Sequence, residues 1–154
     1  FMLVIIFMIY KYKVFGIIAN ISLITNLLML IGILTLLEAT LTLPGIAGII
    51  LTVGMAVDAN VLIFERIKEE LKTEKSLIHA FDTGYQKAKI TVLDANITTF
   101  IAAAILFAFG SGPIKGFAVT LGIGIITTLY SAYFIARHLT SILILRNKNG
   151  EVSL

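Results

Sequence analysis

Two aspartates inside apolar runs are the residues of this sequence best suited to chemistry. Asp58 and Asp94 are each followed by Ala-Asn, so Asp58-Ala-Asn60 and Asp94-Ala-Asn96 repeat one pattern. An ionised aspartate at the centre of a membrane helix costs about 2.5–3.5 kcal/mol. Burial disfavours the charged form of a carboxyl group, so an acid at that depth can bind and release protons near neutral pH. The pattern indicates proton coupling, with Asn60 and Asn96 offering hydrogen bonds beside the acids.

The depth of each acid follows from the helix rise. Asp58 comes 14 residues after Pro44 and eight residues before Arg66, about 21 Å and about 12 Å along a helix. This places Asp58 within the hydrocarbon, and its alternative role is a hydrogen bond to a neighbouring helix. Asp94 stands five residues after Lys89, about 7.5 Å along the helix. Its alternative role is an acid at the membrane interface that pairs with a nearby lysine, Lys87 or Lys89.

The composition excludes several classes of protein. Hydrophobic residues make up 58% of the 154 residues and charged residues 14%, against about 45–50% and about 25% in soluble domains. A soluble domain and a disordered chain are therefore both excluded. With no cysteine and two histidines, we expect neither a metal site nor a cofactor. No phosphate-binding loop or nucleophile–base pair occurs, so an enzyme is not expected.

The apolar runs predict an all-α, polytopic transmembrane helix bundle. A helix needs about 20 apolar residues to cross a bilayer, and glycine and proline punctuate the junctions between the runs. The first run is too short to cross alone and is interpreted as the end of a truncated span. The five predicted spans cover residues 1–10, 14–37, 43–64, 90–114 and 116–136.

The basic residues predict the orientation. With five spans, eleven lysines and arginines fall on one side of the membrane and only Lys115 on the other. By the positive-inside rule, the basic side and the C-terminus are cytoplasmic. The net charge of +3 thus reflects topology, and no nucleic-acid partner is expected. Residues 65–89, on the basic side, have apolar positions at helical spacing and predict an amphipathic connector. It could lie on the membrane surface or pack under the bundle, and it is either a solvated segment or a docking site.

Three stretches of the sequence resemble the SecD/SecF family of protein-export membrane subunits, in its SecD form. They are Gly54-Met-Ala-Val-Asp-Ala-Asn-Val-Leu-Ile-Phe-Glu-Arg66 with its flanks, Asp94-Ala-Asn-Ile-Thr-Thr99, and Phe107-Ala-Phe-Gly-Ser-Gly-Pro-Ile-Lys-Gly-Phe-Ala-Val-Thr-Leu121. The resemblance covers nearly the whole chain. It implies a proton-driven membrane machine of the resistance–nodulation–division superfamily, in which the family's membrane acid corresponds to Asp58.

The resemblance also implies partners and a cellular location. The expected partners are SecF, the SecYEG channel, a translocating preprotein and the lipid bilayer, and the expected location is the bacterial inner membrane. The chain would be the C-terminal membrane half, lacking the first helix and a large extracytoplasmic domain. Two other functions remain open: a small-molecule efflux transporter of the same superfamily, and a scaffold for the channel in which Asp58 carries no proton.

Overall fold

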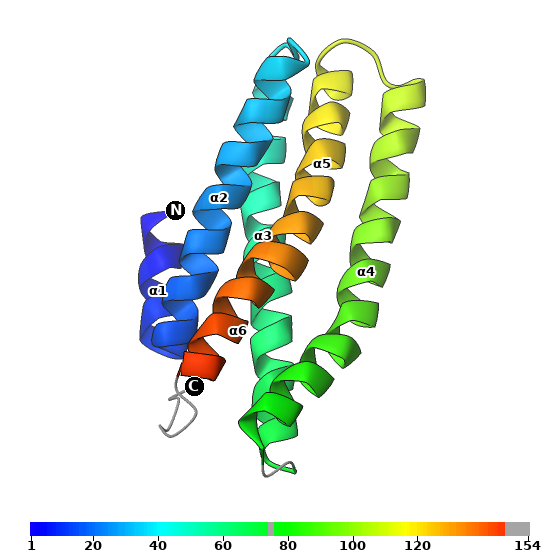
Figure 1. Ribbon diagram of the computed structural model, residues 1–154. Helices are drawn as coiled ribbons and strands as arrows, with labels where there is room; N and C mark the ends of the chain where they lie inside the picture. The colour runs from blue at the N-terminus through cyan, green and yellow to red at the C-terminus, as the bar shows by residue number, and fades with distance from the viewer. Residues whose placement is uncertain (74–75, 147–154) are drawn as a thin grey trace.

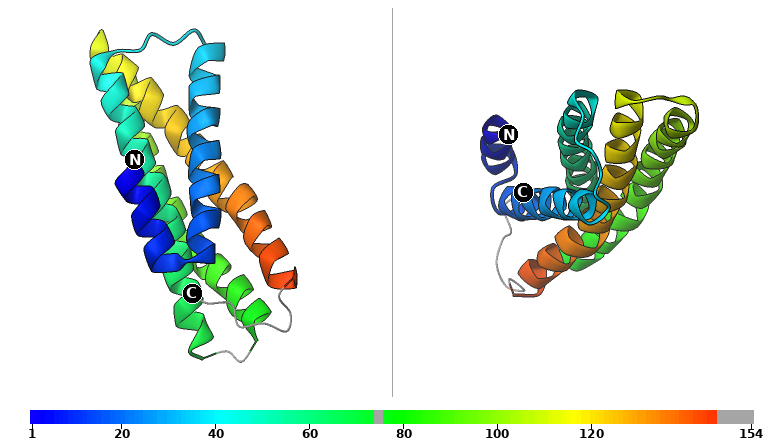
Figure 2. Two further views of the ribbon diagram at one scale, coloured as in Figure 1. Left: turned by 90° about the vertical axis from the view of Figure 1, so that its left-hand side faces the viewer. Right: turned by 90° about the horizontal axis from the view of Figure 1, so that it is seen from above.

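The computed structural model describes residues 1–73 and 76–146, and these residues form helices joined by short turns. The longer helices run side by side and alternate in direction (Figure 1). Seen along their axes, α1 and α4 lie at opposite edges of the bundle (Figure 2). The elements are α1 (Met2–Tyr12), α2 (Val14–Leu36), α3 (Leu43–Leu71), α4 (Leu77–Phe109), α5 (Pro113–Tyr130), one π-helical segment η1 (Ser131–Ala136) and α6 (Arg137–Arg146).

Four stretches of helix are long and apolar enough to cross a membrane. They are α2, α3, α4 and the continuous helix Pro113–Arg146, which joins α5, η1 and α6. The segment α1 is apolar but shorter. The all-α transmembrane bundle predicted from the sequence is confirmed, and the chain is a multi-pass membrane protein.

Glycine, proline and threonine shape the turns at one end of the bundle. Thr42 caps α3, because its hydroxyl accepts a hydrogen bond from the Gly45 amide at 3.1 Å and satisfies a donor of the first turn. Pro44 lies in that turn, where its missing N–H costs nothing. Gly112 has φ of +51° before Pro113 opens α5, a conformation that glycine adopts readily.

The predicted connector over residues 65–89 is wrong as a separate element. Helix α3 continues to Leu71 and α4 begins at Leu77, so nearly all of the segment extends the two membrane helices. Most of the apolar side chains that indicated an amphipathic helix pack into the bundle. Ile67 and Tyr85 are buried in the bundle core, and this burial favours continued helix over an independent surface segment.

Two predicted span boundaries also need correction. The fourth span was predicted over residues 90–114, but α4 ends at Phe109, because the turn before Pro113 cannot continue a helix. The fifth was predicted over residues 116–136, but helix begins at Pro113 and extends to Arg146. The positive charge of Arg137 does not interrupt the helix, because backbone hydrogen bonds continue beyond the hydrocarbon.

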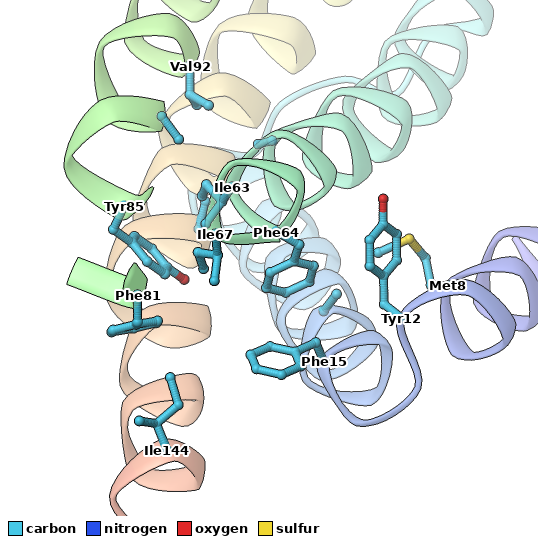
Figure 3. Close-up of a cluster of buried hydrophobic side chains, with 14 residues drawn as sticks. Met8, Tyr12, Phe15, Ile63, Phe64, Ile67, Phe81, Tyr85, Val92 and Ile144 are labelled. Carbon is cyan, nitrogen blue, oxygen red and sulfur yellow. The ribbon is translucent and has the colours of Figure 1, made fainter. Parts of the chain in front are cut away.

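Figure 3 shows the larger of the two clusters of buried hydrophobic side chains found in the described part of the chain. The Phe64 ring of α3 is its centre, with ring centroids of Tyr12 and Phe15 both 5.6 Å away. Side chains from α1, α2, α3, α4, η1 and α6 meet there. Aromatic pairs in such tilted geometry stabilise beyond the area they bury. This cluster holds in place the half of α3 that ends at Leu71, and that half carries the residues discussed below.

Gly84 of α4 sets the approach of α4 to α3. A methyl group at this position would lie 2.8 Å from the Ile67 Cγ1 atom and 2.9 Å from its Cα atom. No side chain fits there without moving the α3 backbone. Close helix approach over a glycine is a usual basis of packing in membranes.

We therefore expect Gly84→Ala to lower the free energy of unfolding by about 1–3 kcal/mol, the usual cost of overpacking. The control is Gly32→Ala, because a methyl group there meets nothing within 4 Å. That change gains up to about 1 kcal/mol of helix propensity. Thermal unfolding of both variants in one detergent checks this. Equal melting temperatures for the two variants would contradict the close contact.

Candidate functional site

Asp58 lies near the middle of α3 on the face that points out of the bundle. Ile50, Gly54, Asp58 and Leu62 are all exposed and recur at every fourth position, whereas Ile63 is fully buried on the other face. In the described part of the chain, the Asp58 carboxylate has neither a hydrogen-bond donor nor an ion-pair partner. The residue predicted to carry protons is therefore presented at the outer surface of the isolated bundle.

A hollow of about 190 Å³ between α3 and α4 contains Asp58. Asn96 and Thr99 of α4 line the same hollow, so α4 supplies polar groups across from the carboxylate. The remaining lining is apolar: Met55, Ala59, Leu62, Val92 and Ala95. The structure thus brings together Asp58 and Asn96, which are 38 positions apart in the sequence.

The two asparagines predicted to support the acids are both buried. The Asn60 amide donates to the Ala56 carbonyl at 3.1 Å, and the Asn96 amide donates to the Val92 carbonyl at 2.7 Å. Each leaves its Oδ1 atom buried without a hydrogen-bond donor. Residues two apart are separated by about 200° around a helix, so Asn60 faces inward while Asp58 faces outward. Asp58 thus shares its hollow with Asn96 of the neighbouring helix and not with Asn60 of its own tripeptide.

Asp94 is exposed on α4 and does not line the hollow. The lysines expected to pair with it are engaged elsewhere. Lys87 bonds to Glu70, with Nζ 2.6 Å from Oε1, and the Lys89 ammonium lies 6.0 Å from the centre of the Tyr133 ring. The structure therefore separates the two aspartates, and only Asp58 shares a hollow with an asparagine.

A polar contact between α2 and the last helix was missed in the sequence. The Asn26 amide donates to the Thr128 hydroxyl at 3.2 Å, and the Ser22 hydroxyl donates to the Ser131 carbonyl at 3.1 Å. Ser131 begins the π-helical segment, where a carbonyl can lose its helical partner. The signal was available, because Ser22 and Asn26 are four apart in a run without charges and so share a helix face.

Glu70 joins α3 to α4 at the charged end and was also missed. Its side chain is only 9% exposed, and its Oε1 atom lies 2.6 Å from Lys87 Nζ and 3.5 Å from Arg66 Nε. Neighbouring Glu69 is 65% exposed, and within the described residues its carboxylate forms an ion pair with Arg66. The Lys87 contact ties α4 to α3, whereas the Arg66 contact lies within α3.

Replacing Glu70 therefore leaves two cations without their buried partner. We expect Glu70→Ala to cost about 1–3 kcal/mol, the range for losing one side of a buried polar contact. Glu69→Ala is the matched control and should cost less than about 1 kcal/mol, as exposed ion pairs do. Chemical or thermal unfolding of the purified subunit compares them. Equal losses would show that the Glu70 contact is as solvent-screened as that of Glu69.

The fold and the site together define a class of protein: a polytopic helical membrane protein with an exposed acid, Asp58, near the middle of a span and beside a hollow between two helices. The family described as protein export membrane protein SecD/SecF, C-terminal, matches residues 1–146. The chain belongs to this family. It is similar to the SecD subunits of Rhodothermus marinus, 57% identical over 147 residues, and Magnetococcus marinus, 56% identical over 135 residues.

These matches cover 96% and 88% of this chain, but 24% and 26% of the two relatives. The chain thus spans about a quarter of the length of the curated relatives it matches. A crystal structure of SecDF from Thermus thermophilus, a translocon-associated membrane protein, aligns with a TM-score of 0.92 at 41% identity. That alignment covers 96% of this chain and 21% of the other. Both the sequence and the fold therefore agree with the resemblance noted above.

Proposed function

We propose that this chain is the membrane part of a Sec export subunit that uses a proton gradient to assist translocation of secreted proteins. Its partners are SecF and the SecYEG channel, and its location is the bacterial inner membrane. The main observation behind this proposal is that Asp58 lies near the middle of α3 on the face that points out of the bundle. Family membership and the similarity to a translocon-associated protein support the export role.

The chemistry of a carboxylate explains why Asp58 needs a partner. Thr52 and Asn60, on the same helix, donate to carbonyls one turn earlier and so satisfy their donors locally. An ionised carboxylate only accepts hydrogen bonds, and a helix interior offers no free donor. Leaving it to lipid costs several kcal/mol. We propose that SecF covers the Asp58 carboxylate and that its membrane helices supply a hydrogen-bond donor or a positive charge.

Protonation of Asp58 is the switching event. It removes a charge from the face between the two subunits and so changes which packing of α3 against the partner is favoured. A proton can shift such an equilibrium only through this difference in stability between two arrangements. A single charge at this depth is worth about 2.5–3.5 kcal/mol, enough to reverse a modest preference.

The distribution of charge indicates which end of the bundle faces the cytoplasm. Nine basic residues of the described chain lie at the end of the bundle where α3 ends and α4 begins, and Lys115 lies at the opposite end. The positive-inside rule makes the basic end cytoplasmic. The end of α6 belongs to the same side (Figure 1), so the C-terminus is cytoplasmic in this proposal.

Asp58→Asn in the full-length protein tests the proposal. Asparagine keeps the size of the side chain but cannot exchange a proton with the gradient, so we expect export to fall to its level without a gradient. Asp94→Asn is the matched control, because Asp94 lies outside the hollow, and should retain gradient-driven export. The measurement is preprotein uptake into membrane vesicles with and without an imposed proton gradient, with SecF assembly checked in parallel.

Retention of gradient-driven export by Asp58→Asn would overturn the proton role and favour a scaffold function. Loss of gradient-driven export in both variants, with normal SecF assembly, would show that proton coupling depends on both aspartates.

A further inference from the structure

A second and larger hollow lies directly beside the one that holds Asp58. Its volume is about 660 Å³, and it lies between the charged ends of α3 and α4. Glu65, Arg66, Glu69 and Lys87 are among the charged residues that line it. Leu62 lines both hollows. The two hollows therefore form one groove between α3 and α4, with Leu62 at their junction.

On α3, Leu62 is the apolar residue that lies between the Asp58 carboxylate and the charged residues of the larger hollow. It lies four residues after Asp58 and three before Glu65, so each side is about one helical turn, or roughly 4–6 Å, away. A hollow of this size lined by charged groups has the room and the polar partners to hold water. The Leu62 side chain is 44% exposed and is not locked into the core. It can therefore change rotamer without disturbing the bundle.

The inner side of α3 offers no comparable path toward the charged end. Ile63, Phe64 and Ile67 are each 0% exposed. Interiors packed to this degree leave no room for a chain of water molecules. At the charged end, the bond from Lys87 on α4 to Glu70 on α3 at 2.6 Å fixes the two helices that border the larger hollow.

We infer that protons leave Asp58 along the groove between α3 and α4, with Leu62 as the gate and the charged hollow as the vestibule. The inference rests on the proposed proton role of Asp58 and adds its route. When the Leu62 side chain lies across the junction, the carboxylate is separated from the vestibule. When it turns aside, water links the two hollows and carries the proton to the charged end.

Cysteine labelling tests the vestibule without depending on the role of Asp58. The comparison is Leu62→Cys against Leu51→Cys in full-length protein otherwise free of cysteine, assembled with SecF. Leu51 is also 44% exposed on α3 but lines neither hollow. A membrane-impermeant maleimide added at the charged side should label position 62 at least about tenfold faster, because thiolates form only where water reaches. Equal or slower labelling at position 62 overturns the inference.

Proton flux tests the gate. In proteoliposomes of the full-length protein with SecF, Leu62→Trp should lower proton uptake about tenfold and Leu62→Ser should raise it, since a tenfold rate corresponds to a small change in barrier. Leu51→Trp should leave uptake unchanged. If Asp58→Asn abolishes proton uptake but both Leu62 variants leave it unchanged, the proposed route is overturned while the proton role of Asp58 stands. Unchanged uptake in Asp58→Asn overturns the proposed function itself.

Discussion

A carboxylate within a membrane span must find its hydrogen-bond donors outside its own helix, and much of this structure follows from that constraint. Thr52, Asn60 and Asn96 each donate to a carbonyl one turn earlier in their own helix, as Thr52 does to Gly48 at 2.9 Å. An ionised carboxylate has no donor to return. Asp58 is therefore stable in lipid only if it is protonated or covered by another protein surface. These are the two states between which the proposed proton coupling would switch Asp58.

The inner face of α3 is what keeps Asp58 turned outward. Lipid removes most of the hydrophobic drive for helix association, so close contacts between small residues and hydrogen bonds take its place. Gly124 of α5 packs directly on Thr52. Gly48 of α3 packs on Thr120, and a methyl group added at Gly48 would lie 3.2 Å from the Thr120 side chain. These contacts leave no rotational freedom for α3. The hydrogen bonds from α2 to Thr128 and Ser131 anchor the last helix in the same way.

The charged end is built on different physics from the rest of the bundle. There, an aromatic cluster around Phe64 (Figure 3) packs next to charged groups that link α3 and α4. The bridge from Glu70 to Lys87 and the contact of Gly84 with Ile67 both tie α4 to α3. The groove that contains Asp58 opens between the same two helices. Rigid ties at its mouth and one exposed leucine inside it favour gating by a side chain over gating by whole helices.

The sequence by itself determined the class of the protein, the helical spans and the candidate acid, because hydrocarbon imposes long apolar runs and makes any charge within them conspicuous. It did not determine which polar groups meet. Asp58 and Asn60 are neighbours in the chain but face opposite ways, whereas Asp58 and Asn96 share a hollow. The extension of α3 and α4 through residues 65–89 was likewise decided by packing, since burial of Ile67 and Tyr85 outweighed the charges around them. Helical periodicity is local and can be read from spacing, but the pairing of faces depends on how separate helices fit together, and only the tertiary structure decides that.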